Sequence, residues 1–247
     1  NIDNNPGDEI ANCVAIGYQA FIGSDNDSTG TTTDANGTVA VGYQSLTALT
    51  SGQGNTAVGF ESLKTNTDGD KNTAVGYQAL MTANPSVSGR GENTCIGYQA
   101  GKSLTTSQSN TFVGFASGDE ITTGEANTAV GAGALHNADD SESNNTCIGY
   151  VAGDVIDGGS NNVCIGSLSD PSGATGTNQT VIGYNATGQA DNSVTLGNAS
   201  VTAVYMAMDA ILLALVVEYH YKEKIVLRII NNLEQYKDIR LAIIMVE

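Results

Sequence analysis

Two acidic turns, DNDSTG and NTDGDKN, hold the residue types that most resemble a cation site. Each turn places two carboxylates two positions apart, and these are Asp25, Asp27, Asp68 and Asp70. A calcium-binding loop begins with side-chain oxygens at alternate positions and ends with a glutamate at its twelfth position. Asn36 stands at that position in the first turn. We therefore expect no bound metal and no cofactor, and we keep Ca²⁺ in these turns as the alternative.

The other side chains that could do chemistry are four cysteines and two histidines. Cys95, Cys147 and Cys164 take a position that alanine holds in related stretches, so we interpret them as small, buried and unpaired residues. Cys13 stands alone, and His136 and His220 occupy unrelated contexts. These residues do not form a metal-ligand cluster in the sequence. No local motif combines Ser, His and Asp either. The sequence predicts that the protein is not an enzyme.

Charge excludes one class of partner. The chain has 247 residues and a net charge of −17, and residues 1–200 hold only four basic side chains, Lys64, Lys71, Arg90 and Lys102. Nucleic-acid binding needs clustered Lys and Arg, so we expect no nucleic-acid partner.

Hydrophobic residues make up 40% of the chain, which favours a folded protein over a disordered one. No charged and apolar stretch typical of a secretory signal stands at the start, so we expect none or one already removed.

A repeated unit explains the unusual composition. The stretch KNTAVGYQAL recurs with small changes, and a glycine that follows an apolar pair marks each copy. The usual step between these glycines is 17 residues, with longer steps early in the chain, and fixed self-similarity of this length is typical of a solenoid. The marker glycines are Gly17, Gly42, Gly59, Gly76, Gly97, Gly114, Gly131, Gly149, Gly166, Gly183 and Gly197.

Each copy predicts a short strand before its glycine. The residue directly before the glycine is Val, Ile or Leu, and the residue three before it is Val or Thr, so both lie on one face of a strand. We expect this branched face to be the core. The residue between them is mostly Ala or Cys, as at Ala74 and Cys95, and we expect it at a tight contact, either between subunits or between walls. Because both faces look buried, a second copy of the chain is the simplest neighbour.

Two further positions predict ladders between successive copies. Asn precedes most of the strands, where it can bond the backbone and stack on itself. An aromatic residue follows most of the marker glycines, and rings at that position can stack from copy to copy.

These copies resemble the head repeats of trimeric autotransporter adhesins and the NTAVGYQAL repeats of viral and phage tail-fibre-like proteins, over residues 10–206. The resemblance implies a left-handed parallel β-roll, three chains on a common axis, an extracellular or virion-surface location and a role in attachment. The adhesin repeat is shorter than 17 residues, so the cross-section here is expected to differ. The C-terminal segment resembles neither the chaperone of viral fibres nor the membrane anchor of autotransporters.

We therefore expect an all-β solenoid in residues 1–206 and a separate apolar segment in residues 207–247. The second segment lacks Gly and Pro, and 3–4 spacing of its apolar residues favours a helix that packs or trimerises, with strands as the alternative. Its apolar run at 211–217 is too short to span a membrane, so no membrane insertion is expected.

The favoured function is a homotrimeric extracellular attachment fibre. The longest steps place insertions at residues 22–36 and 81–92, and projecting loops are where binding residues concentrate. A host-cell or surface receptor, a glycan among them, would then contact Asp25, Asp27, Asp34, Asn84 and Arg90.

Two alternatives remain. One is a purely structural filament or virion spacer without a receptor. The other is ice binding through the Thr position, which we rank lower because we expect those Thr on the inward face.

Overall fold

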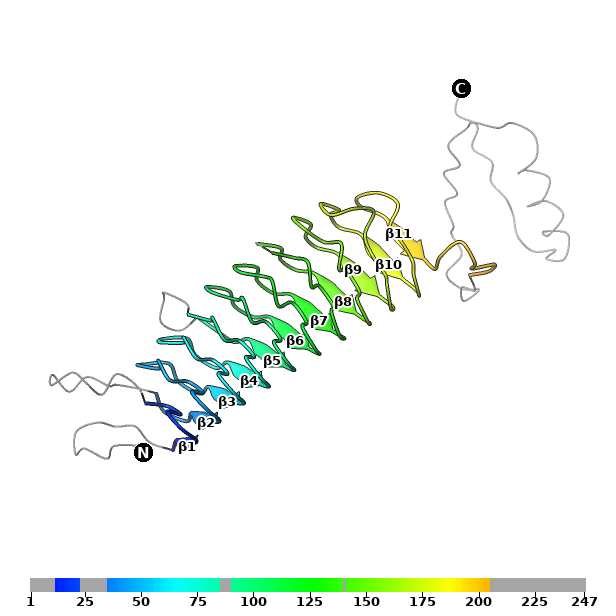
Figure 1. The fold of residues 1–247 in the computed structure, drawn as a ribbon. Helices are drawn as coiled ribbons and strands as arrows, with labels where there is room; N and C mark the ends of the chain where they lie inside the picture. Colours follow the sequence, from blue (N-terminus) through cyan, green and yellow to red (C-terminus); the bar gives the residue numbers. More distant parts are fainter. Residues whose placement is uncertain (1–11, 23–34, 85–89, 140, 205–247) are drawn as a thin grey trace, which may run out of the picture. The chain divides into compact units, whose positions relative to one another are not determined.

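A computed structural model describes residues 12–22, 35–84, 90–139 and 141–204, and this part of the chain is a parallel all-β solenoid (Figure 1). Every strand has three residues, and the strands form one parallel sheet in sequence order. They are β1 (Val14–Ile16), β2 (Val39–Val41), β3 (Thr56–Val58), β4 (Thr73–Val75), β5 (Thr94–Ile96), β6 (Thr111–Val113), β7 (Thr128–Val130), β8 (Thr146–Ile148), β9 (Val163–Ile165), β10 (Thr180–Ile182) and β11 (Val194–Leu196).

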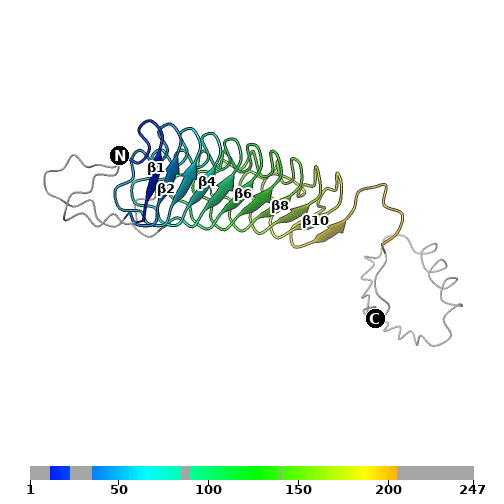
Figure 2. The same cartoon turned by 90° about the horizontal axis from the view of Figure 1, so that it is seen from below.

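The register of the sheet follows the repeat residue for residue. Thr56 pairs with Thr73, Ala57 with Ala74, and the same alignment holds between all neighbouring strands. The strands therefore lie in one row along the solenoid, as Figure 2 shows from a second side. The predicted all-β parallel solenoid is confirmed, and equivalent residues of successive coils form continuous columns.

The predicted assignment of the two strand faces is wrong. The middle residue of every strand from β2 to β10 is fully buried inside the coil, and Ala57, Ala74 and Cys95 are 0% exposed. The branched residues on either side point outward, and Ile16 is 60% exposed and Ile96 40%. The small column therefore contacts the other walls of its own coil, which was one of the two contacts predicted for it. The interior of a 17-residue coil is narrow, so small side chains fit there and branched ones face out.

Side-chain volume is compensated within each coil. Where the inward strand residue is Ala, a buried Leu follows six residues later, as Leu80 follows Ala74. Where it is Cys95, Phe112 or Cys147, glycine takes that place, and a Cβ on Gly118 would lie 2.6 Å from the Phe112 ring. Ile121 then fills the remaining space as a buried side chain. Asp170 and Thr187 take that place after Cys164 and Val181. In the coils of β2 to β8, a change in the volume of the inward strand residue is thus offset by the residue six positions later, as close packing favours.

The marker glycines are required by both space and backbone conformation. Gly59 has a φ of 141°, which favours glycine. A Cβ on Gly59 would lie 2.6 Å from the carbonyl carbon of Gly76 in the next coil. The column of glycines therefore lets successive corners stack directly on each other.

The predicted asparagine ladder is confirmed along the interior. The backbone N–H of Asn110 donates to Oδ1 of Asn93 at 3.0 Å, and the Asn110 side chain donates to the same oxygen and to the carbonyl of Gly124. Asn127 repeats this pattern against Asn110. The buried members Asn55, Asn72, Asn93, Asn110, Asn127, Asn145 and Asn162 continue into Gln179. The ladder satisfies backbone groups that would otherwise be buried without partners.

The chain divides into two compact units, Asn1–Val204 and Tyr205–Glu247. The prediction of a helical segment over residues 207–247 concerns residues outside the described part of the chain. Within the described ranges, no helix has the length and hydropathy needed to cross a membrane.

Candidate functional site

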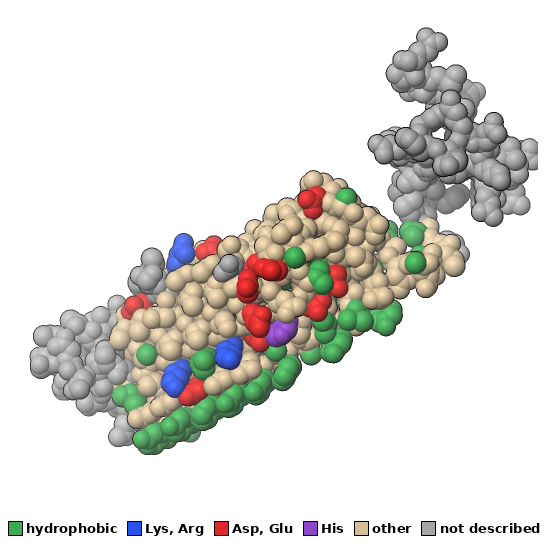
Figure 3. All heavy atoms as spheres, turned by 45° about the horizontal axis from the view of Figure 1, so that its top comes forward, with side chains coloured by type: hydrophobic (Ala, Val, Ile, Leu, Met, Phe, Trp, Pro, Cys, Tyr) green, Lys and Arg blue, Asp and Glu red, His purple; other side chains and the backbone are tan. Residues whose placement is uncertain are grey.

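An apolar face runs along the solenoid and is the strongest candidate for a functional surface. It consists of the outward strand residues, Val or Ile in one column and Thr or Val in the other. Ile96, Val130, Ile148 and Ile182 are each 36–40% exposed although they lie in the middle of a continuous sheet. Figure 3 shows a band of hydrophobic side chains along one edge of the described solenoid. None of the strand residues is charged, so another apolar surface can pack on this face without burying a charged side chain.

Threonine fills much of the second outward column. In β3 to β8 and in β10 the first strand residue is Thr, half buried and on the same face as the Val and Ile column. The expectation that these Thr lie on an inward face is wrong, for the same reason that the branched column is not the core. The face therefore combines regularly spaced methyl and hydroxyl groups.

A stack of aromatic rings lies directly after the marker glycines. Neighbouring ring centroids are 5.0–5.4 Å apart and the planes differ by 6–15° from Tyr18 to Phe115. The predicted aromatic ladder is confirmed for these coils. Its members are Tyr18, Tyr43, Phe60, Tyr77, Tyr98 and Phe115.

The predicted receptor-contacting residues fall into two groups. Asp25, Asp27 and Asp34 lie outside the described residues. Asn84 and Arg90 are described and lie within the second insertion. The Asn84 side chain accepts a hydrogen bond from the Thr67 hydroxyl at 2.6 Å, which ties it to the preceding coil.

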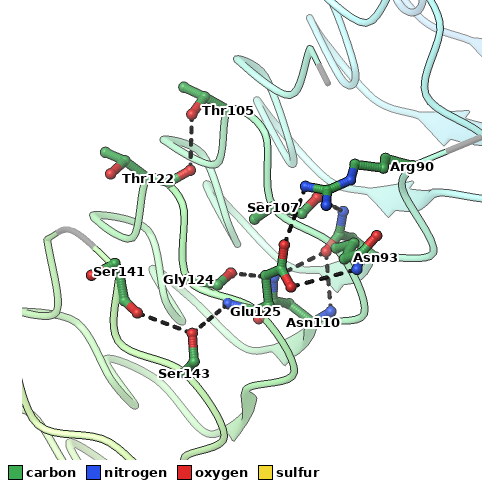
Figure 4. A network of polar contacts seen from close by, with 11 residues as sticks. Arg90, Asn93, Thr105, Ser107, Asn110, Thr122, Gly124, Glu125, Ser141 and Ser143 are labelled. Carbon is green, nitrogen blue, oxygen red and sulfur yellow. Dashed lines mark hydrogen bonds and ion pairs between the residues drawn. The ribbon is translucent and has the colours of Figure 1, made fainter. Parts of the chain in front are cut away.

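Arg90 belongs to a surface network that extends from the coil of β5 to the coil of β8 (Figure 4). Its Nη1 lies 3.4 Å from Oε1 of Glu125, and both side chains are partly exposed. The backbone N–H of Glu125 donates to the Ser143 hydroxyl at 3.0 Å. An exposed pair of this length contributes little to stability, so the Arg90 guanidinium is available for other acceptors.

The weak metal candidates Asp68 and Asp70 act as links between coils. Asp68 accepts hydrogen bonds from the hydroxyls of Ser51, Thr50 and Thr67, and the Ser51 bond is the main cause that lowers the pKa of Asp68. Asp70 accepts from the backbone N–H of Gln53 at 2.7 Å. Both carboxylates are thus engaged with protein donors, and the structure does not bring them together in one described cluster of acids.

A cluster of acids that the sequence analysis did not single out lies further along. Ligand atoms of Asp139, Glu142 and Asp157 lie within 4.8 Å of one another. Glu142 is buried and accepts a hydrogen bond from the backbone N–H of Gly158 at 2.6 Å. Asp139 and Asp157 hold the same position of consecutive coils, eight residues after their marker glycines, and that alignment is the signal that could have identified two of the three.

Two titratable groups have perturbed pKa values. Burial, and next the charge of Asp154, raises the pKa of Asp170 to about 6, and Oδ1 of Asp170 has no hydrogen-bond partner among the described residues. A hydrogen bond from Nδ1 of His136 to Asp119 raises the pKa of His136.

The described cysteines form no disulfide. Cys95, Cys147 and Cys164 are buried and unpaired, as predicted, and burial strongly raises the pKa of Cys95.

Comparison with known proteins gives no relative: no family model matches the chain, and no curated protein matches it significantly. The likeness to fibre and adhesin repeats therefore rests on the repeat motif, and the function that it implies remains a proposal.

Proposed function

We propose that the protein is the shaft of a homotrimeric extracellular attachment fibre. The observation that carries this proposal is the continuous, uncharged, half-exposed face formed by the outward residues of β1 to β11. Large contiguous apolar surfaces on soluble proteins mark sites of interaction. A surface that repeats at every coil meets an identical surface at every coil when a second copy packs beside it. The apolar surface supports self-association. The resemblance of the repeats to those of trimeric fibres supports three chains in the assembly.

Self-association is tested by placing charges on this face. Val130→Glu with Ile148→Glu puts two carboxylates into the centre of the surface, and burying unpaired charges is strongly unfavourable. Val155→Glu is the matched control, because Val155 has a similar exposure of 39% but lies outside the strands. We expect light scattering to give a trimer for the wild-type chain and for the control, and a smaller species for the double variant. A folded wild-type monomer would overturn the assembly.

Attachment itself is assigned to the insertions. The longest steps of the sequence repeat place insertions at residues 22–36 and 81–92, and the partly exposed Arg90 lies within the second insertion. Three copies on one axis multiply weak contacts, so each loop needs only modest affinity. Exchanging each insertion for the shorter turn of a neighbouring coil is expected to abolish binding to cells or glycans while the mass of the assembly stays unchanged. Unchanged binding would refute the receptor role and favour the structural spacer.

The outward Thr column favours a second candidate function, binding to ice. Thr hydroxyls and methyls recur at the strand spacing of about 4.8 Å, and cross-coil ladders keep such a sheet flat. A flat, regular array of this kind can match an ordered water lattice only when it is free of other chains. The two functions therefore compete for the same face. Thermal hysteresis in a solution of monomers would favour ice binding, and its absence together with a trimeric mass would favour the fibre.

A further inference from the structure

The aromatic stack is interrupted at two coils. Ala132 and Ser167 stand where the other coils from β1 to β10 carry Tyr or Phe. Ala132 separates Phe115 from Tyr150, and Ser167 separates Tyr150 from Tyr184. The rings on either side of Ala132 therefore lack a neighbour at the next coil.

The backbone shows that these rings remain aligned across the interruption. The carbonyl of Phe115 accepts from the N–H of Gly133 at 2.9 Å, and the carbonyl of Ala132 accepts from the N–H of Val151 at 2.9 Å. Phe115, Ala132 and Tyr150 thus occupy one column in three consecutive coils. Since each step in the stack separates ring centroids by 5.0–5.4 Å, two steps place Phe115 and Tyr150 roughly 10 Å apart.

Exposure shows that the ring faces bordering the gap are free. Rings with a neighbour on both sides are 39–44% exposed, as for Phe60 and Tyr98. Phe115 is 60% exposed and Tyr150 61%, close to the 65% of Tyr18 at the end of the stack. The gap thus offers two parallel aromatic faces at the spacing that one further ring would fill.

We propose that the gap at Ala132 is a binding site for one planar aromatic ring of a small molecule. Aromatic pairs favour offset stacking at centroid distances that match the steps of this column. The residues beside the gap are apolar: Ala116, Gly133 and Val151 take the position at which earlier coils carry a Gln or Glu ladder. Ala116, Gly133 and Val151 offer the hydroxyls of a sugar ring no hydrogen-bond partner, which favours an aromatic group. The inference rests on the ring column alone and is separate from the proposed attachment.

The test uses 3-methylindole as the probe with the full-length chain. The protein has no Trp, so the indole emission of the probe can be followed separately. We expect saturable binding with a Kd on the order of 1 mM, as suits a fragment of this size. Ala132→Tyr places a ring of the protein itself in the gap and should weaken binding at least about tenfold.

Two further variants keep the result interpretable. Ser167→Tyr fills the second gap of the column, between Tyr150 and Tyr184, and should retain binding at Ala132; Ala132→Tyr is therefore compared with the wild type in this background as well. Phe115→Ala removes one wall of the site and should lose it. Absence of saturable binding to the wild-type chain, or equal binding by Ala132→Tyr, would overturn the site. Equal binding of methyl glucoside would overturn the aromatic class of ligand.

Discussion

At the scale of single residues, the interior is governed by volume. In the coils of β2 to β8, an inward strand residue is combined with a partner six residues later, and the pair is Ala with Leu or a larger residue with glycine. Leu80, which partners Ala74, has a φ of 50°, where glycine is favoured. The coil thus accepts a strained Leu at this position when Ala leaves room for it.

This rule predicts a rescue. Ala74→Phe adds a ring to a full coil and should lower the free energy of unfolding by about 1–3 kcal/mol. The triple variant with Leu80→Gly and Ala83→Ile reproduces the set Phe112, Gly118 and Ile121 and should recover most of that loss. Urea unfolding of both variants and the wild type measures the difference. If the triple variant is less stable than Ala74→Phe, the volumes are not compensated within the coil.

Asp170 predicts a pH dependence. Its pKa of about 6 in the folded protein lies above its usual value of 3.8, so folding favours the protonated carboxyl. The stabilisation is fully present below about pH 3.8 and is lost as the pH rises through about 6. Asp170→Asn carries an amide in place of that carboxyl and should have a higher Tm than the wild type at pH 7. The difference between the two should shrink toward pH 4, as measured by thermal unfolding across this range.

His136 changes stability in the same direction at higher pH, because Asp119 raises its pKa. Both Asp170→Asn and the wild type contain His136, so its effect cancels in the comparison. A Tm difference that does not vary between pH 4 and 7 would contradict the assignment to Asp170.

At the scale of elements, the asparagine ladder joins coils that each have only a three-residue strand. Asn110→Ala removes the acceptor of two N–H groups of Asn127, and these lie buried. We expect a loss of about 1–3 kcal/mol in the free energy of unfolding. Asn84→Ala, at an exposed position, should change it by less than about 0.5 kcal/mol. Equal losses in urea unfolding would show that the ladder is not the cause.

Sequence periodicity predicts the strands, their register and both ladders, because each depends on residues at a fixed place in the repeat. The direction of the faces could not be obtained this way, since a period of two separates the faces without saying which is inside. The pairing of Ala74 with Leu80 and of Phe112 with Gly118 is the signal that would have assigned the inward face. Glu142 escaped notice because it follows an irregular turn and reaches the acidic cluster only through folding.

At the scale of the whole molecule, the exposed face links folding to assembly. If copies pack on this face, its apolar side chains are buried only in the assembly. The stability of the folded state then depends on protein concentration. We expect the Tm to rise over a hundredfold increase in concentration, measured by scanning calorimetry. The variant with Val130→Glu and Ile148→Glu should lose this dependence. A wild-type Tm that does not change with protein concentration would show that folding does not depend on self-association.

The inter-coil hydrogen bonds carry a mechanical consequence. Those between successive strands, such as the bonds from Gly76 to Val58 and from Gly97 to Val75, join one coil to the next along the solenoid. Tension applied between the two ends of the solenoid therefore loads the coils in series, so each bears the same force and the weakest coil peels away first. Each released 17-residue coil lengthens the tether by roughly 50 Å. A solenoid built this way yields in steps under a sudden pull and so limits the force that passes from one end to the other.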